Sequence, residues 1–467
     1  MIDARLMDGN SLRICSWNVN GIKNPFGYKP WSEKKSYAGM FETLEADIVC
    51  MQEVKIQRKD ITLDMVEIPG WNVFFSLPRA RKGYSGVAIY TRDSKCMPYK
   101  AEEGLTGCLP SAMPDKSPYW TPASGNNIDG YLQYAPADAL SIDSEGRCIL
   151  LDFGLFILIN VYCPAMTDEG RQPYRMAFLE AMEKRVRNLH ALGRNIILVG
   201  DLNIVRDVID TAEPSDSTSG NLDFKSSASR QLLDRMLLPH EDGILADVCR
   251  HLFPERTGMF THWDTKINAR PGNYGSRIDY ILCSASLLPQ IEAADIYPGL
   301  LGSDHCPVFA TLRVPRDDKP IDSLQTADQV QNAKPPRLAA RFMSAFAGRQ
   351  TIGSMFASMT AGKKEPAVMR NSPQSSEPVH LLKEARVGKR RASSQPDSGN
   401  LLSFVKRSQG EKPKEEEAVG IDRDENLKSV DGNEFYRAIS DENTTKVLWK
   451  SLFAKQQSPL CDKHKEP

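Results

Sequence analysis

Three clusters of polar residues in this 467-residue chain stand at the ends of short apolar runs. Each cluster brings a carboxylate, a carboxamide or an imidazole to the end of its run. The clusters read Ser16-Trp-Asn18-Val-Asn20-Gly21, Gly200-Asp201-Leu-Asn203 and Gly302-Ser-Asp304-His305. These are the groups from which a metal-dependent phosphodiesterase assembles its site.

The apolar runs predict buried strands, because they are short, rich in Ile, Val and Leu, and closed by turn-forming residues. The expected strands are Leu12–Val19, Ile48–Met51, Leu150–Val161, Ile196–Val199 and Ile278–Cys283. Helices are expected over Glu33–Glu45 and Gln172–Leu192. Strands alternating with helices indicate an α/β class of layered sheets covered by helices. The polar clusters therefore sit at strand ends, which are rigid enough to preorganise a site.

Phosphodiester hydrolysis needs a cation, a base for water and hydrogen-bond donors for the phosphoryl oxygens. Magnesium prefers one or two carboxylates, and Glu53 and Asp304 are the candidates. Asp201 and Asn203 point to one side because they alternate with Leu202, so one can accept a proton while the other donates hydrogen bonds. Both the Glu53 carboxylate and the Asp-x-Asn pair have a purely structural alternative as strand or turn caps.

An imidazole completes the set of candidate groups. His305 follows Asp304 at a Gly-Ser turn, and Asp279 is a carboxylate that could orient it. An imidazole oriented by a carboxylate is the arrangement found in catalytic acid/base dyads. The sequence alone leaves open whether Asp201 or His305 is the base.

Six motifs resemble, in the same order, the exonuclease III family of apurinic/apyrimidinic endonucleases within the DNase I-like phosphoesterases. They are Trp17-Asn18-Val-Asn20-Gly21, Gln52-Glu53-Val-Lys55, Asn160-Val-Tyr162-Cys-Pro164, Gly200-Asp201-Leu-Asn203, Arg277-Ile-Asp279-Tyr280 and Ser303-Asp304-His305. The resemblance covers residues 12 to 314. It implies a four-layer α/β sandwich, with two mixed sheets inside and helices outside, and base excision repair of DNA as the activity.

The resemblance also implies roles for individual residues. The metal, Mg²⁺ with Mn²⁺ as an alternative, would be held by a set comprising Asn20, Glu53, Asp201, Asn203, Asp304 and His305. The catalytic residues would be Tyr162 on the phosphate, Asp201 activating water or protonating the leaving oxygen, Asn203 stabilising the transition state, and His305 paired with Asp279. The expected enzyme is an apurinic/apyrimidinic endonuclease with 3′-phosphodiesterase and 3′–5′ exonuclease activity.

Several positions depart from the family pattern. Asn20 stands where some members carry a carboxylate, and Ala165 stands where the major endonucleases have an Asn on the phosphate. His262 and Ser276 replace aromatics that surround the base-free sugar. The predicted substrate contacts are Asn18, Asn203, His262, Ser276 and Ile278. A less aromatic pocket grips a flipped-out abasic residue less specifically, so we expect 3′-end processing to exceed abasic incision.

The AP endonuclease 2 branch of the family, and its fungal members in particular, resembles the chain best. The motifs are Ala101–Gly107, the insertion that ends at Asp143–Arg147, and the terminal Pro459–Pro467. In that branch the terminal stretch opens a GRF zinc finger, with Cys461 and His464 as first ligands. A structural zinc site needs four ligands, so we expect Zn²⁺ only in a longer form with a complete finger.

Composition divides the chain into three expected parts: a catalytic domain over residues 1–315, a disordered linker over 316–457, and the start of a finger over 458–467. The linker is rich in Gln, Lys, Glu, Ser and Pro, and buries too little apolar surface to fold alone. Residues 349–356 and 398–405 resemble degenerate peptides that bind the sliding clamp PCNA. The basic cluster Lys389–Arg391 is compatible with nuclear import, so we expect a nuclear protein.

Cysteine usage and hydropathy exclude two classes of protein. Ten cysteines without regular spacing, and no apolar signal segment, argue against a secreted disulfide framework. Cys50, Cys148, Cys163 and Cys283 lie in apolar runs and are expected to be core residues. No run approaches the roughly twenty apolar residues that span a bilayer. No membrane partner is therefore expected. The family resemblance implies a monomer that binds DNA, and the net charge of −1 permits a local basic surface.

Two other function classes fit part of the pattern. A phosphoinositide or sphingolipid phosphodiesterase of the same fold would share the Asp-x-Asn and Ser-Asp-His clusters. A noncatalytic clamp-binding scaffold would need only the linker motifs. The motifs around Asn18 and Tyr162 favour DNA over both alternatives.

Overall fold

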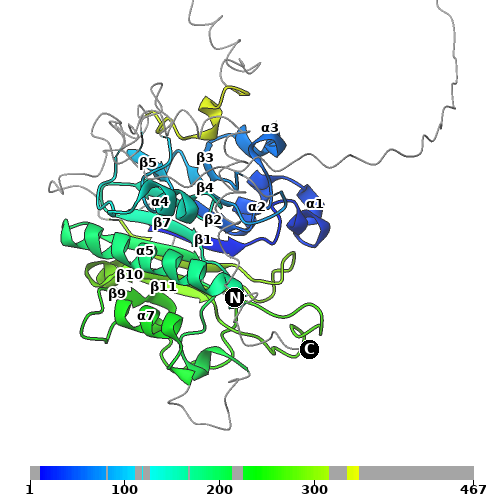
Figure 1. The fold of residues 1–467 in the computed structure, drawn as a ribbon. Coiled ribbons are helices and arrows are strands. Elements are labelled where there is room, and N and C mark those ends of the chain that lie inside the picture. The colour runs from blue at the N-terminus through cyan, green and yellow to red at the C-terminus, as the bar shows by residue number, and fades with distance from the viewer. Residues whose placement is uncertain are drawn as a thin grey trace, which may run out of the picture. The chain divides into compact units, whose positions relative to one another are not determined.

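The strands that the structure describes form two six-stranded sheets, which lie face to face in this computed structural model (Figure 1). The described residues are 11–79, 82–110, 118, 127–166, 169–212, 224–314 and 334–346. All of them belong to one compact unit.

The first sheet has the strand order β11-β12-β1-β2-β4-β3. Its strands are β11 (Ile291–Ile296), β12 (Val308–Arg313), β1 (Ser11–Asn18), β2 (Ile48–Gln52), β4 (Val87–Arg92) and β3 (Trp71–Ser76). The central pair β1 and β2 runs parallel, and the other neighbours are antiparallel. The chain therefore leaves β1 and β2 at the same edge of the sheet.

The second sheet has the order β5-β6-β7-β8-β10-β9. Its strands are β5 (Lys100–Glu103), β6 (Cys148–Asp152), β7 (Ile157–Tyr162), β8 (Ile196–Asp201), β10 (Asp279–Ser284) and β9 (Leu245–Asp247). Here β7 and β8 are the parallel pair. Both sheets are mixed, as the family resemblance implies.

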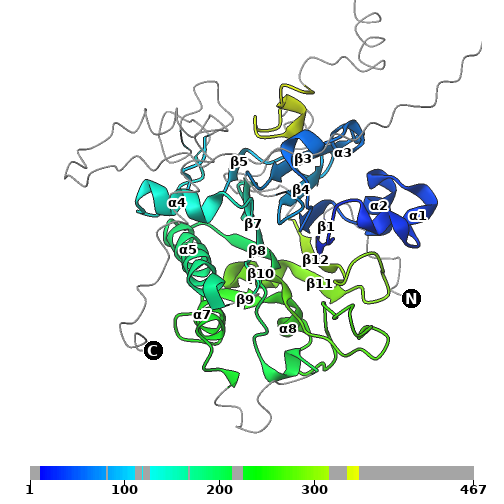
Figure 2. The same cartoon turned by 45° about the vertical axis from the view of Figure 1, so that its right-hand side comes forward.

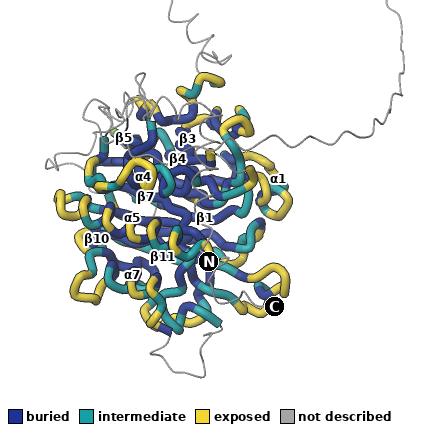
Figure 3. Tube along the Cα trace, viewed as in Figure 1, coloured by how far each residue is buried: buried dark blue, intermediate teal, exposed yellow. Residues whose placement is uncertain are grey.

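Helices cover the outer faces of both sheets, so the fold has four layers (Figure 2). Within the described residues the covering helices are α1 (Trp31–Lys34), α2 (Tyr37–Thr43), α3 (Leu63–Val66), α4 (Pro136–Asp143), α5 (Gln172–Ala191) and α7 (Ala228–Met236). The short helix α8 (Val248–Leu252) instead packs against β10 and β11 and contributes to the core between the sheets. One apolar core fills the space between the sheets, one lies under α2 and α3, and one lies under α5 and α7. The buried strands in the middle of Figure 3 reflect these cores. The predicted four-layer α/β sandwich is confirmed.

Two of the predicted elements are wrong in detail. The run Leu150–Val161 is not one strand but the antiparallel pair β6 and β7, because Gly154 turns the chain at a φ of 79° and its N–H donates to Asp152. The helix expected over Glu33–Glu45 is split into α1 and α2. Lys35 ends α1 with a φ of 46°, and the Ser36 hydroxyl then caps α2 by accepting from the Gly39 N–H at 3.1 Å.

The boundary predicted at Pro315 leaves out a segment of the fold. Residues 334–346 pack on the domain although they lie inside the predicted linker. Leu338, Ala339 and Ala340 are buried, and Arg341 donates to the Trp71 carbonyl at 3.0 Å. These small apolar residues supply the contacts that the polar composition around them conceals. The remainder of the predicted linker, with both clamp motifs and Lys389–Arg391, lies outside the described residues. So does the predicted start of the finger, with Cys461 and His464.

Cysteines and helices within the described ranges agree with the composition. All nine cysteines there are free and buried, including the four expected in the core. No helix in these ranges is both long enough and apolar enough to cross a membrane.

Candidate active site

Side chains from strand ends of both sheets meet at one edge of the sandwich. Asn18 ends β1, Glu53 follows β2, Asp201 ends β8 and Asp279 begins β10. The antiparallel register of β8 and β10 places Asp279 directly opposite Asp201. His305, shortly before β12, completes this group through its bond to Asp279. We refer to these five residues as the strand-end cluster.

The Asn18 side chain joins the two sheets. Its Nδ2 donates to Glu53 Oε1 and to Asp201 Oδ2, each at 2.9 Å, while its Oδ1 accepts from the Asn20 N–H at 3.0 Å. The side chain is fully buried. An amide nitrogen carries only two hydrogens, so Asn18 must give up one of these bonds before it can donate to a substrate.

Gly200 allows β7 and β8 to approach closely beside the cluster. Its φ is 131°, and a Cβ at this position would lie 1.9 Å from the Val161 carbonyl oxygen. No side chain fits in that space. The glycine therefore lets Tyr162 and Asp201, which are paired in the parallel register, stand next to each other.

Tyr162 is held by a cation that the sequence interpretation overlooked. The Arg147 guanidinium lies 4.7 Å from the centre of the Tyr162 ring, and its Nη1 donates to the Tyr162 carbonyl at 3.0 Å. Burial, then the charges of Glu53 and Asp201, raise the pKa of Tyr162 well above its usual value. The phenol is therefore neutral and able to donate a hydrogen bond.

Three of the predicted site residues occupy the left-handed backbone region. Asn20, Glu53 and Asn203 have φ values of 47°, 51° and 51°. This region is uncommon for residues other than glycine, and less costly for Asn than for Glu. Such conformations persist only where the surrounding structure enforces them, and they concentrate at functional sites.

Asp279 and His305 form the predicted carboxylate–imidazole pair. His305 Nδ1 and Asp279 Oδ2 are 2.8 Å apart, and His305 Nε2 is 3.9 Å from Asp201 Oδ2. Burial lowers the pKa of His305, but Asp279 and then Asp201 outweigh it and raise this pKa to about 10. Burial and the Asp279 charge raise the pKa of Asp201 to about 7. With both pKa values raised, Asp201 and His305 together hold a proton at neutral pH.

The oxygen ligands expected for a metal lie beside this pair. Asn20 Nδ2 donates to Asp304 Oδ1 at 3.0 Å. Lys55 Nζ is 2.8 Å from Glu53 Oε2 and also donates to Asn20 Oδ1. Burial raises the pKa of Glu53, but the hydrogen bonds from Asn18 and Lys55 lower it by more, so the pKa is below its usual value. Burial likewise raises the pKa of Asp304, and His305 and His262 bring it below its usual value. Both carboxylates are therefore ionised.

Asn203 lies against Asp201, but its amide nitrogen is already in use. Nδ2 donates to the Cys163 carbonyl at 2.9 Å and to Asp201 Oδ2 at 3.3 Å. The Asn203 N–H also donates to Asp201 Oδ1, at 2.9 Å. A role in donating to the phosphate requires Asn203 to exchange the longer of its two Nδ2 bonds.

The predicted pocket residues lie on two chain segments that pair through His262 and Ser276, and His262 adjoins His305. The backbone of His262 pairs with both Ser276 and His305. Its ring centre is 4.6 Å from that of His305, and burial together with the His305 charge lowers the pKa of His262. The Ser276 hydroxyl lies 3.0 Å from that of Thr211, while Ile278 is buried. Direct contact of these residues with a substrate stays a prediction.

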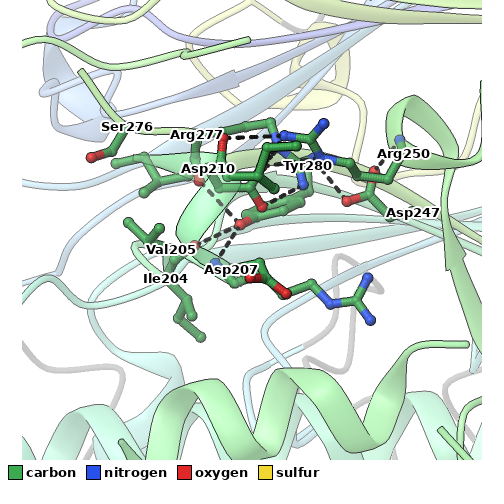
Figure 4. A network of polar contacts seen from close by, with 12 residues as sticks. Ile204, Val205, Asp207, Asp210, Asp247, Arg250, Ser276, Arg277 and Tyr280 are labelled. Atoms are coloured by element: carbon green, nitrogen blue, oxygen red, sulfur yellow. Dashed lines mark hydrogen bonds and ion pairs between the residues drawn. The ribbon is translucent and has the colours of Figure 1, made fainter. Parts of the chain in front are cut away.

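The sequence interpretation missed a second polar network, centred on Arg277, which precedes Asp279 by two residues. Figure 4 shows this network. Arg277 donates from Nε and Nη2 to the two Asp210 oxygens at 2.9 and 2.8 Å, and its Nη1 is 2.8 Å from Asp247 Oδ2. Arg250 also donates to Asp210. We call Asp210, Asp247, Arg250 and Arg277 the arginine network. It fastens the segment after Asn203 to the segment before Asp279.

Comparison with known proteins connects this geometry to a family. Residues 15–305 match the Endonuclease/Exonuclease/phosphatase family. The chain is 39% identical to the DNA-(apurinic or apyrimidinic site) endonuclease 2 of Schizosaccharomyces pombe, over 98% of this chain and 89% of that protein. The corresponding human protein is 30% identical, over 98% and 92% of the two chains. The chain belongs to the AP endonuclease 2 branch of this family.

Solved structures agree with the AP endonuclease 2 assignment. The crystal structure of the Xenopus laevis APE2 catalytic domain is similar with a TM-score of 0.58 and 29% identity, and the match covers 72% of this chain and 99% of that one. The AP endonuclease LMAP of Leishmania major shares the fold, with a TM-score of 0.51 and 21% identity. The predicted family and fold are thereby confirmed. This chain is an enzyme of the AP endonuclease phosphodiesterase family.

Proposed function

We propose that this chain is a DNA-repair nuclease of the nucleus that hydrolyses phosphodiesters beside abasic sites and at blocked 3′ ends. The names of its relatives and the strand-end cluster support this reading. The observation that carries it is the Asn18 bridge, which holds Glu53 and Asp201 together next to the Asp279–His305 pair. One group of oxygens suited to a cation thus adjoins one pair suited to proton transfer.

The donor set near Glu53 fits a hard divalent cation. The Lys55 ammonium contacts both Glu53 and Asn20, so these oxygens already converge on one positive charge. Together with Asp304 they would hold Mg²⁺, or Mn²⁺ as an alternative. When bound, the ion would neutralise charge that grows on the phosphoryl oxygens.

The proton is managed by Asp201 and His305. Asp279 keeps the hydrogen on His305 Nδ1, which leaves Nε2 as the nitrogen that faces Asp201. The pair takes a proton from the attacking water or gives one to the leaving oxygen. The Tyr162 hydroxyl and the Asn203 amide donate to the phosphoryl oxygens, where charge develops in the transition state.

The pocket favours 3′ ends over abasic incision. His262, Ser276 and Ile278 offer less aromatic surface than the dedicated abasic pocket of the family, and Ala165 lacks an amide for the phosphate. Each stack of an aromatic side chain on a base contributes on the order of 1 to 3 kcal/mol. We therefore assign the stronger activity to 3′-phosphodiesterase and 3′–5′ exonuclease action.

A purified-protein assay tests the proposal directly. Matched abasic, 3′-phosphoglycolate and recessed DNA substrates are compared with a phosphoinositide, each with Mg²⁺ and with Mn²⁺. We expect cation-dependent cleavage of DNA, fastest at 3′ ends. Hydrolysis of the lipid alone would make the chain a lipid phosphodiesterase, and binding of PCNA through 349–356 or 398–405 without any cleavage would make it a scaffold.

A further inference from the structure

His262 lies at the strand-end cluster but has no part in the proton transfer derived above. Its backbone N–H donates to the Ser276 carbonyl at 2.9 Å, and its carbonyl accepts from the Ser276 N–H at 3.0 Å. The neighbouring Trp263 N–H donates to the Asp304 carbonyl at 3.0 Å. These bonds on both sides fix the imidazole of His262 beside His305 and Asp304.

The three side chains bring metal-binding atoms close together. One ligand atom each from His262, Asp304 and His305 lies within 4.8 Å of the other two. Two imidazoles and a carboxylate form a donor set that suits Zn²⁺, whose ligand bonds are about 2.0–2.2 Å long. Magnesium, in contrast, prefers oxygen ligands. The addition of His262 therefore selects a different class of cation from the one expected at Glu53.

Two of the three ligands are also preorientated by their neighbours. Asp279 engages Nδ1 of His305 at 2.8 Å, so Nε2 is the nitrogen that a cation would bind as it displaces the Nε2 proton. A carboxylate behind the imidazole is the usual partner of a zinc-bound histidine. Asp304 Oδ1 is held by Asn20 at 3.0 Å and by Ser303 at 3.1 Å, so the second Asp304 oxygen is the one left for a cation.

We propose that His262, Asp304 and His305 form an inhibitory site for an imidazole-binding divalent cation of the Zn²⁺ class. Zinc at this site would occupy Nε2 of His305 and an oxygen of Asp304. Both atoms belong to the proposed hydrolytic site, so zinc and turnover exclude each other. The inhibitory consequence rests on the proposed function, whereas the binding of the cation does not.

Direct binding is measured with Zn²⁺ on the full chain and on two matched variants. All three proteins carry Cys461→Ser and His464→Ala, which remove the other two predicted zinc ligands. His262→Phe keeps a ring beside His305 but removes both nitrogens. His240→Phe removes an exposed imidazole that lies 4.0 Å from Asp242, so it serves as the control. We expect His262→Phe to weaken one binding event at least tenfold and His240→Phe to change nothing. Unchanged affinity in His262→Phe would overturn the site.

A second measurement tests inhibition separately. For each protein we measure the Zn²⁺ concentration that reduces the Mg²⁺-dependent release of 3′-phosphoglycolate to half of that protein's own zinc-free rate. It should rise at least tenfold in His262→Phe and stay constant in His240→Phe. Zinc that binds at His262 without slowing cleavage would refute the inhibitory role. A chain that binds zinc as expected but cleaves no DNA would refute the proposed function and leave the site intact.

Discussion

The strand-end cluster and the arginine network are neighbours that differ in charge balance. Buried carboxylates are paired with guanidinium groups in the network but outnumber the cations in the cluster. The network sets two carboxylates, Asp210 and Asp247, against two guanidinium groups, and every partner is within ion-pair distance. The cluster and its neighbour Asp304 gather four carboxylates, with Lys55 and His305 as the nearby cations. Balanced charge stabilises the fold, whereas the excess of negative charge in the cluster suits the cation and the proton transfer that we propose there.

The largest effect that separates the two regions is expected from Asp201→Ala. Loss of this proton-handling group should lower kcat by about 10³-fold. Because Asp201 is buried opposite another carboxylate, relief of that repulsion should offset the loss of its bonds from Asn18 and Asn203, so the unfolding free energy should change little. Steady-state cleavage and urea unfolding measure both quantities, with the exposed Asp64→Ala as the control. Near-full activity of Asp201→Ala would contradict the assignment of the site.

Asp210→Asn should mainly lower the unfolding free energy, whereas Asp201→Ala mainly lowers kcat. Removing one charge from a buried, hydrogen-bonded ion pair costs about 3 kcal/mol. Burial raises the pKa of Asp210, but Arg277 and then Arg250 lower it by more, so this pKa lies below its usual value. Its contribution is therefore present above the unfolded pKa of about 3.9 and is lost as the pH falls through the lower folded pKa.

Urea unfolding of wild type and Asp210→Asn at pH 7 and in steps below pH 4 measures this contribution. The difference between the two proteins should be largest at neutral pH and should shrink in acid. A constant difference at every pH would mean that packing, rather than ion pairing, stabilises this region.

Glu53→Gln tests whether the cluster's excess negative charge binds the cation. The variant keeps the shape of the side chain and its bond from Asn18, but loses the charge. We expect the Mg²⁺ concentration for half-maximal cleavage to rise roughly 10- to 100-fold, the range seen when support for a metal is removed. Glu67→Gln, at an exposed position, is the matched control. An unchanged Mg²⁺ requirement would place the cation elsewhere.

The smallest effect is expected from Ser276→Trp, which alters the pocket between the two regions. A new aromatic surface should raise abasic incision relative to exonuclease action by about tenfold, as the gain of one stacking contact predicts. The two rates are measured on matched substrates, and their ratio cancels any general loss of fold. Should the ratio stay the same or fall, the preference for 3′ ends must arise outside this pocket.

The sequence predicted the residues that local pattern defines. Polar residues after apolar runs marked Asn18, Glu53 and Asp201 as strand-end groups, because the end of a buried strand is visible in a single stretch of chain. The pairing of Asp279 with His305 followed from chemical type and from the family resemblance. The layers of the fold likewise followed from the alternation of strands and helices.

Contacts between distant residues were not predictable in this way. Asp210 and Arg277 are 67 positions apart, and neither lies in a pattern that points to the other. Arg147 appeared only as the end of an insertion, although its guanidinium packs on Tyr162. Lys55 was part of a motif, but its contact with Asn20 depends on the left-handed turn at Glu53, which periodicity does not encode.

The left-handed backbone conformation of Glu53 means that selection for stability and selection for catalysis favour different residues at this position. Glycine adopts a φ of 51° without steric cost, and asparagine does so at a lower cost than glutamate. A screen that rewards only heat resistance should therefore enrich Gly or Asn at position 53 and recover inactive proteins. Under the proposed function, cleavage of substrate is what rewards the Glu53 carboxylate in this unfavourable backbone conformation. Laboratory evolution of this chain would have to select for both properties at once.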